Sequence, residues 1–243
     1  MSKLPNAPLV EVVAEIKWKV ENKADLSKIQ YLPGDLFNEV KKKYPERESI
    51  IPPDIPLELV LNKPAHRFKS DNKDGYPLIQ VGAGVVTLNT LDKIYQWETF
   101  FDELQKVTKR FIRVFPYEQG EKEVYPSILF LDFFPFDFEN RNAIEYINQY
   151  FNITLQQNFF ETDTLPGDLN LKFSYEVDLG DLIVTFQRGK NNEQKEGILM
   201  QTRINGISLN ANAEDISGWF ESAHEFLQRA IQKTNRRRVV QFI

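Results

Sequence analysis

The stretch from Leu9 to Val20 constrains the fold of this chain most, because its side chains alternate in character with a period of two. One set is entirely apolar: Val10, Val12, Ala14, Ile16, Trp18 and Val20. The other set is mostly charged: Glu11, Val13, Glu15, Lys17 and Lys19. This alternation is typical of a half-buried strand, with one face on the core and the other toward solvent. Pro5 and Pro8 mark the start of the strand.

Strand-like and helix-like segments follow in an order that repeats. In the first half we expect a helix over 35–44, a proline-rich connector over 51–64 with a short strand at 57–61, strands over 66–70 and 76–90, and a helix over 92–115. In the second half we expect a strand over 124–136, a helix over 142–156, strands over 169–179, 182–189 and 198–209, and a helix over 215–234.

The ends of the two halves also match in detail. Each has a strand containing Leu-Asn, at Leu88-Asn89 and Leu209-Asn210, and each has a tryptophan near the start of its closing helix, at Trp97 and Trp219. The sequence therefore predicts an α+β fold with a predominantly antiparallel sheet, built from two similar strand-helix-strands-helix halves with helices packed on one face. The halves would span 1–118 and 119–243, as two units or as one continuous pseudo-symmetric domain.

Three motifs carry a resemblance to a known group of proteins. They are N-A-P-L-V-E-V-V-A-E-I over 6–16, L-N-T with Y-x-W-E-x-F over 88–100, and W-F-E-S-A-H-E-F over 219–226. Through them, essentially the whole chain resembles a sporadically distributed family of uncharacterised prokaryotic proteins. The resemblance implies no activity, cofactor or catalytic residue, and the patchy distribution is that of accessory, defence or toxin–antitoxin genes.

One departure from that family falls in the central strand of the second half. Family members tend to have a Gly-Leu-Arg-Tyr-like sequence where this chain has Ile128-Leu129-Phe130-Leu131. The strand has no arginine here, so no role for such a residue carries over.

Composition excludes several kinds of chemistry. The 243 residues include no cysteine, which removes disulfides, thiol nucleophiles and thiolate metal sites. The net charge of −5 is not that of a dedicated nucleic-acid binder. His66 and His224 form no H-x-x-x-H or H-E-x-x-H pattern, so we expect no metal and no cofactor. With no signal-peptide pattern and no long apolar run, we expect a cytoplasmic protein without a membrane partner.

Two groups of residues could still carry chemistry. Asp132, Asp137 and Glu139 could supply a carboxylate pair, but solvated strand edges explain them more simply. Gly82 and Gly84 resemble a fragment of a phosphate loop but lack its remaining residues, so a strand bulge or a close backbone approach is the simpler interpretation. We therefore predict no catalytic residue and favour a protein that is not an enzyme.

The C-terminal region is the remaining candidate for binding. A basic cluster at the end of the last helix could contact phosphate or nucleic acid: Arg229, Lys233, Arg236, Arg237 and Arg238. Cations are also favoured at a helix C-terminus without any ligand. An apolar tail that could bind a partner follows: Val239, Val240, Phe242 and Ile243.

These features predict a non-enzymatic binding protein that recognises a protein partner or associates with itself. One alternative is a nucleic-acid-binding module that uses the arginine cluster. The other is a small-ligand protein or enzyme with a pocket between sheet and helix.

Overall fold

The computed structural model describes residues 9–235 apart from 53, 119, 152 and 157–164. The first half comprises β1 (Leu9–Trp18), α1 (Lys23–Ile29), α2 (Leu32–Val40), β2 (Glu46–Ser49), a 3₁₀ turn η1 (Leu57–Leu59), β3 (His66–Lys69), β4 (Leu78–Gly82), β5 (Val85–Leu91), a 3₁₀ turn η2 (Asp92–Ile94) and α3 (Trp97–Val114). The second half comprises β6 (Glu123–Pro135), α4 (Ala143–Tyr150), β7 (Asn170–Val177), β8 (Gly180–Lys190), β9 (Glu196–Gly206), β10 (Leu209–Asn210) and α5 (Ala213–Asn235).

The strands form one ten-stranded sheet in the order β2-β3-β4-β5-β1-β6-β9-β8-β7, and β10 adds to β6. All the strand pairs described are antiparallel. The α+β fold with a predominantly antiparallel sheet is therefore confirmed.

The central pair of strands, β1 and β6, joins the two halves. Outward from it, β5, β4 and β3 follow β1 on one side, and β9, β8 and β7 follow β6 on the other. In both halves the first strand lies at the centre, and the strand that precedes the closing helix region lies beside it. The strand order is similar in the two halves but not identical, because β2 continues the first half beyond β3 and β10 pairs with β6 off this order. The repeat and the division at 118/119 stay predictions.

The residue correspondence between the halves differs from the expectation. Trp97 is the first residue of α3, whereas Trp219 lies in the interior of α5. Leu88-Asn89 lies within β5, whereas Leu209-Asn210 forms the separate strand β10. The entries to the two helices explain this difference. The 3₁₀ turn η2 leads into α3, while Asn212 accepts a hydrogen bond from the Asp215 N–H (2.8 Å) at the start of α5.

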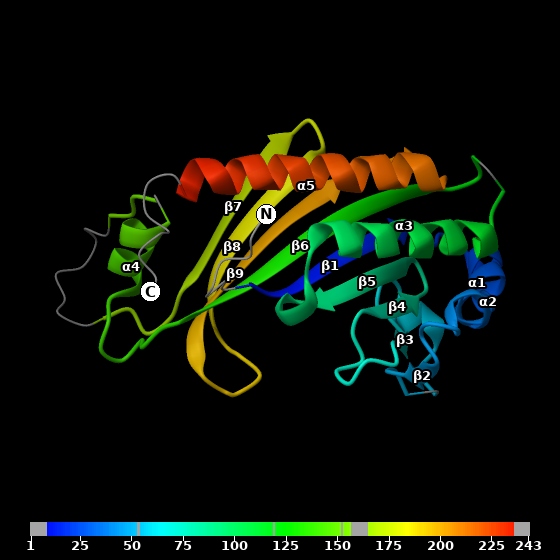
Figure 1. Ribbon diagram of the computed structural model, residues 1–243, viewed down its shortest axis with the longest axis horizontal. Coiled ribbons are helices and arrows are strands. Elements are labelled where there is room, and N and C mark those ends of the chain that lie inside the picture. Colours follow the sequence, from blue (N-terminus) through cyan, green and yellow to red (C-terminus); the bar gives the residue numbers. More distant parts are fainter. Residues whose placement is uncertain (1–8, 53, 119, 152, 157–164, 236–243) are drawn as a thin grey trace.

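The main core lies between the sheet and the helices and includes residues from both halves. Val12, Ala14, Ile16 and Trp18 of β1 are buried, as their alternation predicts. Trp18 packs against Phe111 of α3, and the same core contains Phe220 of α5. Figure 1 shows α3 and α5 side by side across one face of the sheet, where they contact each other. The predicted placement of helices on one face is thus confirmed.

The second core lies under α4, at the far end of the same face. It contains Ile147 of α4, Phe186 of β8 and Ile198 of β9. Ile198 is separated by an even number of residues from Ile204, which belongs to the main core, so both point to the same side of β9. Helices α2, α3, α4 and α5 therefore share one face of the sheet, and the opposite face is called the open face below.

Two predicted segments of the first half fold differently. The strand expected over 76–90 is a hairpin, with Gly84 in its turn at a positive φ of 90°. A Cβ on Gly82 would lie 2.0 Å from the carbonyl oxygen of Lys63. Glycine is therefore needed here for a close approach of two backbone segments, as the simpler interpretation of the sequence expected. The strand expected over 57–61 is instead η1, in which the Leu59 N–H bonds the Pro56 carbonyl at 3.0 Å.

Helix boundaries also differ from the expectations. α1 has no counterpart among the predicted helices, α2 begins at Leu32 and not at residue 35, and α4 ends at Tyr150 and not at 156. The side chain of Asn142 accepts from the N–H groups of Ile144 and Glu145, which sets the start of α4 as predicted.

Candidate functional site

The centre of the open face carries polar side chains from four adjacent strands. The strand registers place them together, because residues directly opposite each other in an antiparallel pair share a face. Glu15 lies opposite Thr87 on one side and Ser127 on the other, and Leu129 of β6 lies opposite Arg203. We call this set the central polar band: Glu11, Glu15, Lys17, Thr87, Asn89, Ser127 and Arg203.

Glu15 contacts three other residues of the central polar band. Its Oε1 accepts a hydrogen bond from Ser127 Oγ at 3.1 Å and one from Arg203 Nη1 at 3.2 Å. Lys17 Nζ lies 2.8 Å from the same oxygen. The side chain of Glu15 is only 14% exposed, while those of Lys17 and Arg203 are 37% and 30% exposed. A half-buried carboxylate needs such partners, because losing water without them is costly. The partners also hold Glu15 in one position.

The other end of the band is a hydrogen-bonded chain across β5 and β1. Thr87 Oγ1 donates to Asn89 Oδ1 at 2.6 Å, and Asn89 Nδ2 donates to Glu11 Oε1 at 2.8 Å. Thr87 and Asn89 are both buried. The chain fixes the orientation of the Glu11 carboxylate on the face.

The polar character continues beyond the band onto β3 and β2. Glu48 accepts from Arg67 at 3.0 Å and from Lys69 at 2.8 Å. The hydrogen bond from Lys69 and the nearby charges of both cations lower the pKa of Glu48. Its charge is therefore retained to lower pH, and the open face presents charges of both signs.

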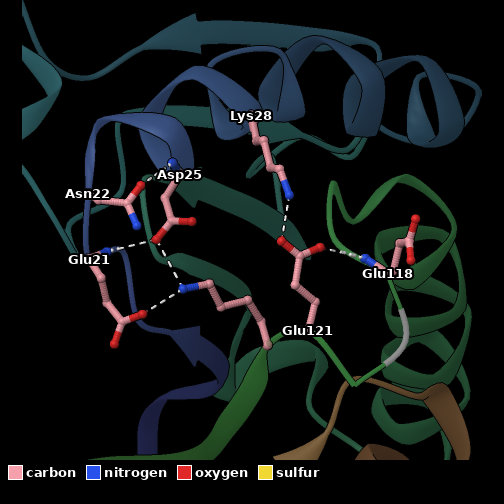
Figure 2. Close-up of polar contacts among 7 residues, drawn as sticks. Glu21, Asn22, Asp25, Lys28, Glu118 and Glu121 are labelled. Atoms are coloured by element: carbon pink, nitrogen blue, oxygen red, sulfur yellow. Dashed lines mark hydrogen bonds and ion pairs between the residues drawn. The ribbon is translucent and has the colours of Figure 1, made fainter.

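A second polar cluster joins the two halves at one end of the molecule. Asp25 at the start of α1 accepts a hydrogen bond from the Glu21 N–H at 2.9 Å (Figure 2). It also accepts one from Lys122 Nζ at 3.0 Å. Lys122 also donates to Glu21 Oε2 at 2.8 Å. Burial opposes ionisation of Asp25, but these hydrogen bonds outweigh it and lower its pKa. Hydrogen bonding to Glu21 raises the pKa of Lys122.

A neighbouring ion pair adds to this cluster. Lys28 Nζ lies 2.5 Å from Glu121 Oε1, and Glu121 Oε2 accepts from the Glu118 N–H at 3.1 Å (Figure 2). The charges of Asp25, Lys122 and Glu121 are thus engaged within the chain. We interpret the cluster as a structural contact that holds α1 against the segment preceding β6.

Of the carboxylates singled out from the sequence, Asp132 lies apart from Asp137 and Glu139, which line the same hollow. Asp132 points to the helix-covered side of β6, where burial and the nearby Asp92 raise its pKa to about 7. Asp137 is exposed, and its side chain accepts from the N–H groups of Glu139 and Asn140. Asp137 therefore stabilises a turn after β6, and Asp132 and Asp137 do not share a site.

The two histidines lie in different surroundings. His224 on α5 stacks on Trp97 with ring centroids 3.7 Å apart and an angle of 6°, and burial lowers its pKa to about 4. His66 is half-buried on β3. Within the described residues, no group of three or more His, Asp or Glu side chains could hold a metal ion.

The basic cluster is only partly described. Arg229 is exposed on α5, and Lys233 lies near the end of that helix. Arg236, Arg237 and Arg238, like the tail residues Val239, Val240, Phe242 and Ile243, lie outside the described residues. A phosphate or nucleic-acid contact at this end therefore stays a prediction.

Two hollows lie away from the central polar band. The larger, about 460 Å³, is open to solvent and is lined by Pro135, Phe136, Asp137, Glu139, Arg141 and Glu196. The smaller, about 130 Å³, lies by Pro33 of α2 and His66 of β3. Neither of these two hollows lies between the sheet and α3 or α5, where Trp18, Phe111 and Phe220 are buried in the main core.

Comparison of the chain with protein-family models, with curated proteins and with solved structures finds no match. The resemblance to a prokaryotic family thus stays a prediction. Within the described residues, no helix has the length and apolar character needed to cross a membrane.

No residue of the central polar band was among the sequence-based candidates. The alternation of β1 already places Glu11, Glu15 and Lys17 away from the core. Nothing in the sequence pairs them with Ser127 or Arg203, which lie 112 and 188 positions from Glu15. Only the order of strands in the sheet brings these residues together.

Proposed function

We propose that this protein is a non-enzymatic binding protein that recognises a protein partner through the central polar band. One observation carries the proposal. Helices α2 to α5 share one face of the sheet, and the opposite face presents ordered, partly exposed charges at its centre. Side chains held on rigid strands lose little conformational freedom on binding, so a larger share of each contact appears as affinity.

The chemistry of the band indicates what the partner should carry. The contacts of Arg203 and Lys17 described above converge on a single oxygen, Glu15 Oε1. A guanidinium has five N–H donors and an ammonium has three, so both cations can bind a second acceptor. Carboxylates form the strongest such contacts, especially with arginine. The docking segment of the partner would therefore bring an acidic side chain to Arg203 and Lys17.

The family resemblance supplies the biological context of the proposal. The distribution of that family is the one of accessory, defence or toxin–antitoxin genes, and binding of a protein partner is one of the activities that such genes encode.

The test compares two variants of equal charge. Lys17→Gln/Arg203→Gln removes both cations of the band, and Lys106→Gln/Lys109→Gln removes two exposed lysines from α3. Each protein is used as bait in extract of the native host, and bound proteins are quantified by mass spectrometry after circular dichroism has confirmed folding. We expect a partner that wild type and the α3 variant retain and that the band variant loses at least ~10-fold, which corresponds to about 1.4 kcal/mol.

Equal retention by both variants would exclude the band as the docking site, and the absence of any retained partner would contradict the proposal as a whole. Binding of short oligonucleotides that weakens steeply with salt would instead favour the nucleic-acid alternative.

A further inference from the structure

The strand β7 ends the sheet, and its outer edge pairs with no other strand among the described residues. Its pairing with β8 is continuous over eight residues, from Asn170 opposite Gln187 to Val177 opposite Gly180. β7 contains no proline and its register shows no bulge. Prolines and bulges are two of the features that usually prevent an edge strand from pairing with another chain. The edge is thus suited to accept another strand.

The hairpin geometry shows which backbone groups face outward. Val177 and Gly180 enclose a two-residue turn, so they exchange both of their hydrogen bonds. Along an antiparallel strand the bonding direction alternates with each residue. The odd-numbered residues of β7 therefore bond to β8, and the N–H and C=O groups of the even-numbered residues face the outer edge: Asn170, Lys172, Ser174 and Glu176.

The side chains of β7 are complementary to a second copy of the same strand. If two β7 strands pair antiparallel about Ser174, Lys172 of each lies opposite Glu176 of the other. On the other face, Phe173 lies opposite Tyr175 and Leu171 opposite Val177. Tyr175 is 52% exposed in the single chain. Opposite charges and paired aromatic or aliphatic residues are the cross-strand neighbours that stabilise sheets.

Other two-fold registers lack this match. In a two-fold pairing of two β7 strands, the even-numbered residues of one copy must lie opposite even-numbered residues of the other. The two-fold axis can therefore pass only through a residue position of β7, and not between two residues. A centre at Lys172 or at Glu176 places like charges opposite each other, and a centre at Phe173 or Tyr175 leaves Lys172 and Glu176 without each other. In the register centred on Ser174, Lys172 of each copy lies opposite Glu176 of the other, which gives two pairs of opposite charges.

A contact within the chain also favours a cation at this edge. Glu176 lies directly opposite Asp181 of β8, and like charges in that position destabilise a sheet. Lys172 of a second copy would lie on the free side of Glu176 and offset the repulsion.

We propose that two copies of this protein associate through antiparallel pairing of their β7 strands about Ser174, which continues the sheet across a two-fold axis. The edge is separate from the central polar band, so this inference and the proposed function can fail independently.

The first experiment measures mass by sedimentation over a range of concentrations. We expect the mass of the wild type to rise from 28.4 kDa toward twice that value as concentration increases. Ser174→Pro removes an outward N–H that β8 does not use, so the chain should fold and remain a monomer. Ser174→Ala keeps the N–H and should associate like the wild type.

The second experiment tests the register with a charge exchange. Lys172→Glu places glutamates opposite each other and should shift dimerisation to at least ~10-fold higher concentration. Lys172→Glu/Glu176→Lys restores opposite charges across the axis and should recover the dimer. A wild type that remains at 28.4 kDa up to its solubility limit would overturn the proposal. So would a Ser174→Pro variant that associates normally, or a double variant that stays as weak as Lys172→Glu.

Discussion

In the layer between the sheet and the helices, Asp132 and His224 are largely buried and have no cation beside them in the contacts described, whereas on the open face Glu15 and Glu48 lie against cations. Burial raises the pKa of Asp132 to about 7 and lowers that of His224 to about 4, so burial favours the neutral form of each. On the open face, Lys69 lowers the pKa of Glu48, and Glu15 contacts Arg203 and Lys17. The covered face thus disfavours charge, while the open face preserves it in a form that a partner can reach.

The strongest test of this comparison is Glu103, which is buried in the helix layer but has partners. It accepts from Tyr44 Oη at 2.7 Å and from Lys43 Nζ at 2.6 Å. Glu103→Ala should lower the free energy of unfolding by about 3 kcal/mol, because the Tyr44 hydroxyl would stay buried without its acceptor. Urea denaturation measures the change. Glu103→Gln keeps an acceptor and should lose much less, and an equal loss would mean that the charge itself matters.

Asp132 provides the next largest effect, and its sign depends on pH. Its pKa of about 7 in the folded protein exceeds the ordinary value of 3.8, so the folded state binds its proton more tightly. The wild type therefore loses stability as the pH rises from about 4 to about 7. Asp132→Asn removes this loss and should be about 2 kcal/mol more stable than wild type at pH 8, with little difference at pH 4. Urea denaturation at both pH values measures it.

Asp137→Asn is the matched control for Asp132, because Asp137 is exposed and hydrogen-bonded to Asn140. It should give no gain at pH 8. If Asp132→Asn also gives none, Asp132 is ionised at no cost and the contrast between the faces is weaker than described.

His224 shows the opposite dependence on pH. Its pKa of about 4 in the folded protein lies below the ordinary value of 6.5, so the unfolded state binds the proton more tightly. Stability should fall as the pH decreases from 6.5 to about 4. His224→Phe retains a ring against Trp97 but cannot be protonated, so it should lack about 1–2 kcal/mol of that acid-dependent loss. Thermal unfolding at pH 7 and pH 4.5 gives the comparison, and parallel losses in both proteins would argue against it.

The smallest effect is expected on the open face. Arg203→Gln removes one of the partners of Glu15 but leaves Ser127 and Lys17 in place. Because these charges are partly exposed, the free energy of unfolding should fall by no more than about 1 kcal/mol, and by less at high salt. A loss as large as that of Glu103→Ala would show that the central polar band is needed for folding and would weaken its assignment to binding.

The properties that depend on nearby residues could be predicted from the sequence. The period of two in β1 determined which side chains are buried, because successive residues of a strand point to opposite faces. The helical spacing of Trp97, Leu104 and Phe111 similarly predicted the helix that includes α3. Local patterns failed where a short segment is compatible with both a strand and a turn. The segment 82–84 joins β4 and β5 in a hairpin. The segment 57–61 contains a 3₁₀ turn in place of the expected strand.

Only the tertiary structure decided which strands are neighbours, and the candidate site depends on that order. β1 lies between β5 and β6, so Glu15 meets Ser127, and β9 lies next to β6, so Arg203 reaches the same carboxylate. Strand order is set by how the complete core packs, and no segment encodes it alone. The sequence by itself thus determined that β1 would have one apolar face and one mostly charged face. The packing of the whole chain decided which charges meet, and that β7 would be left at an edge.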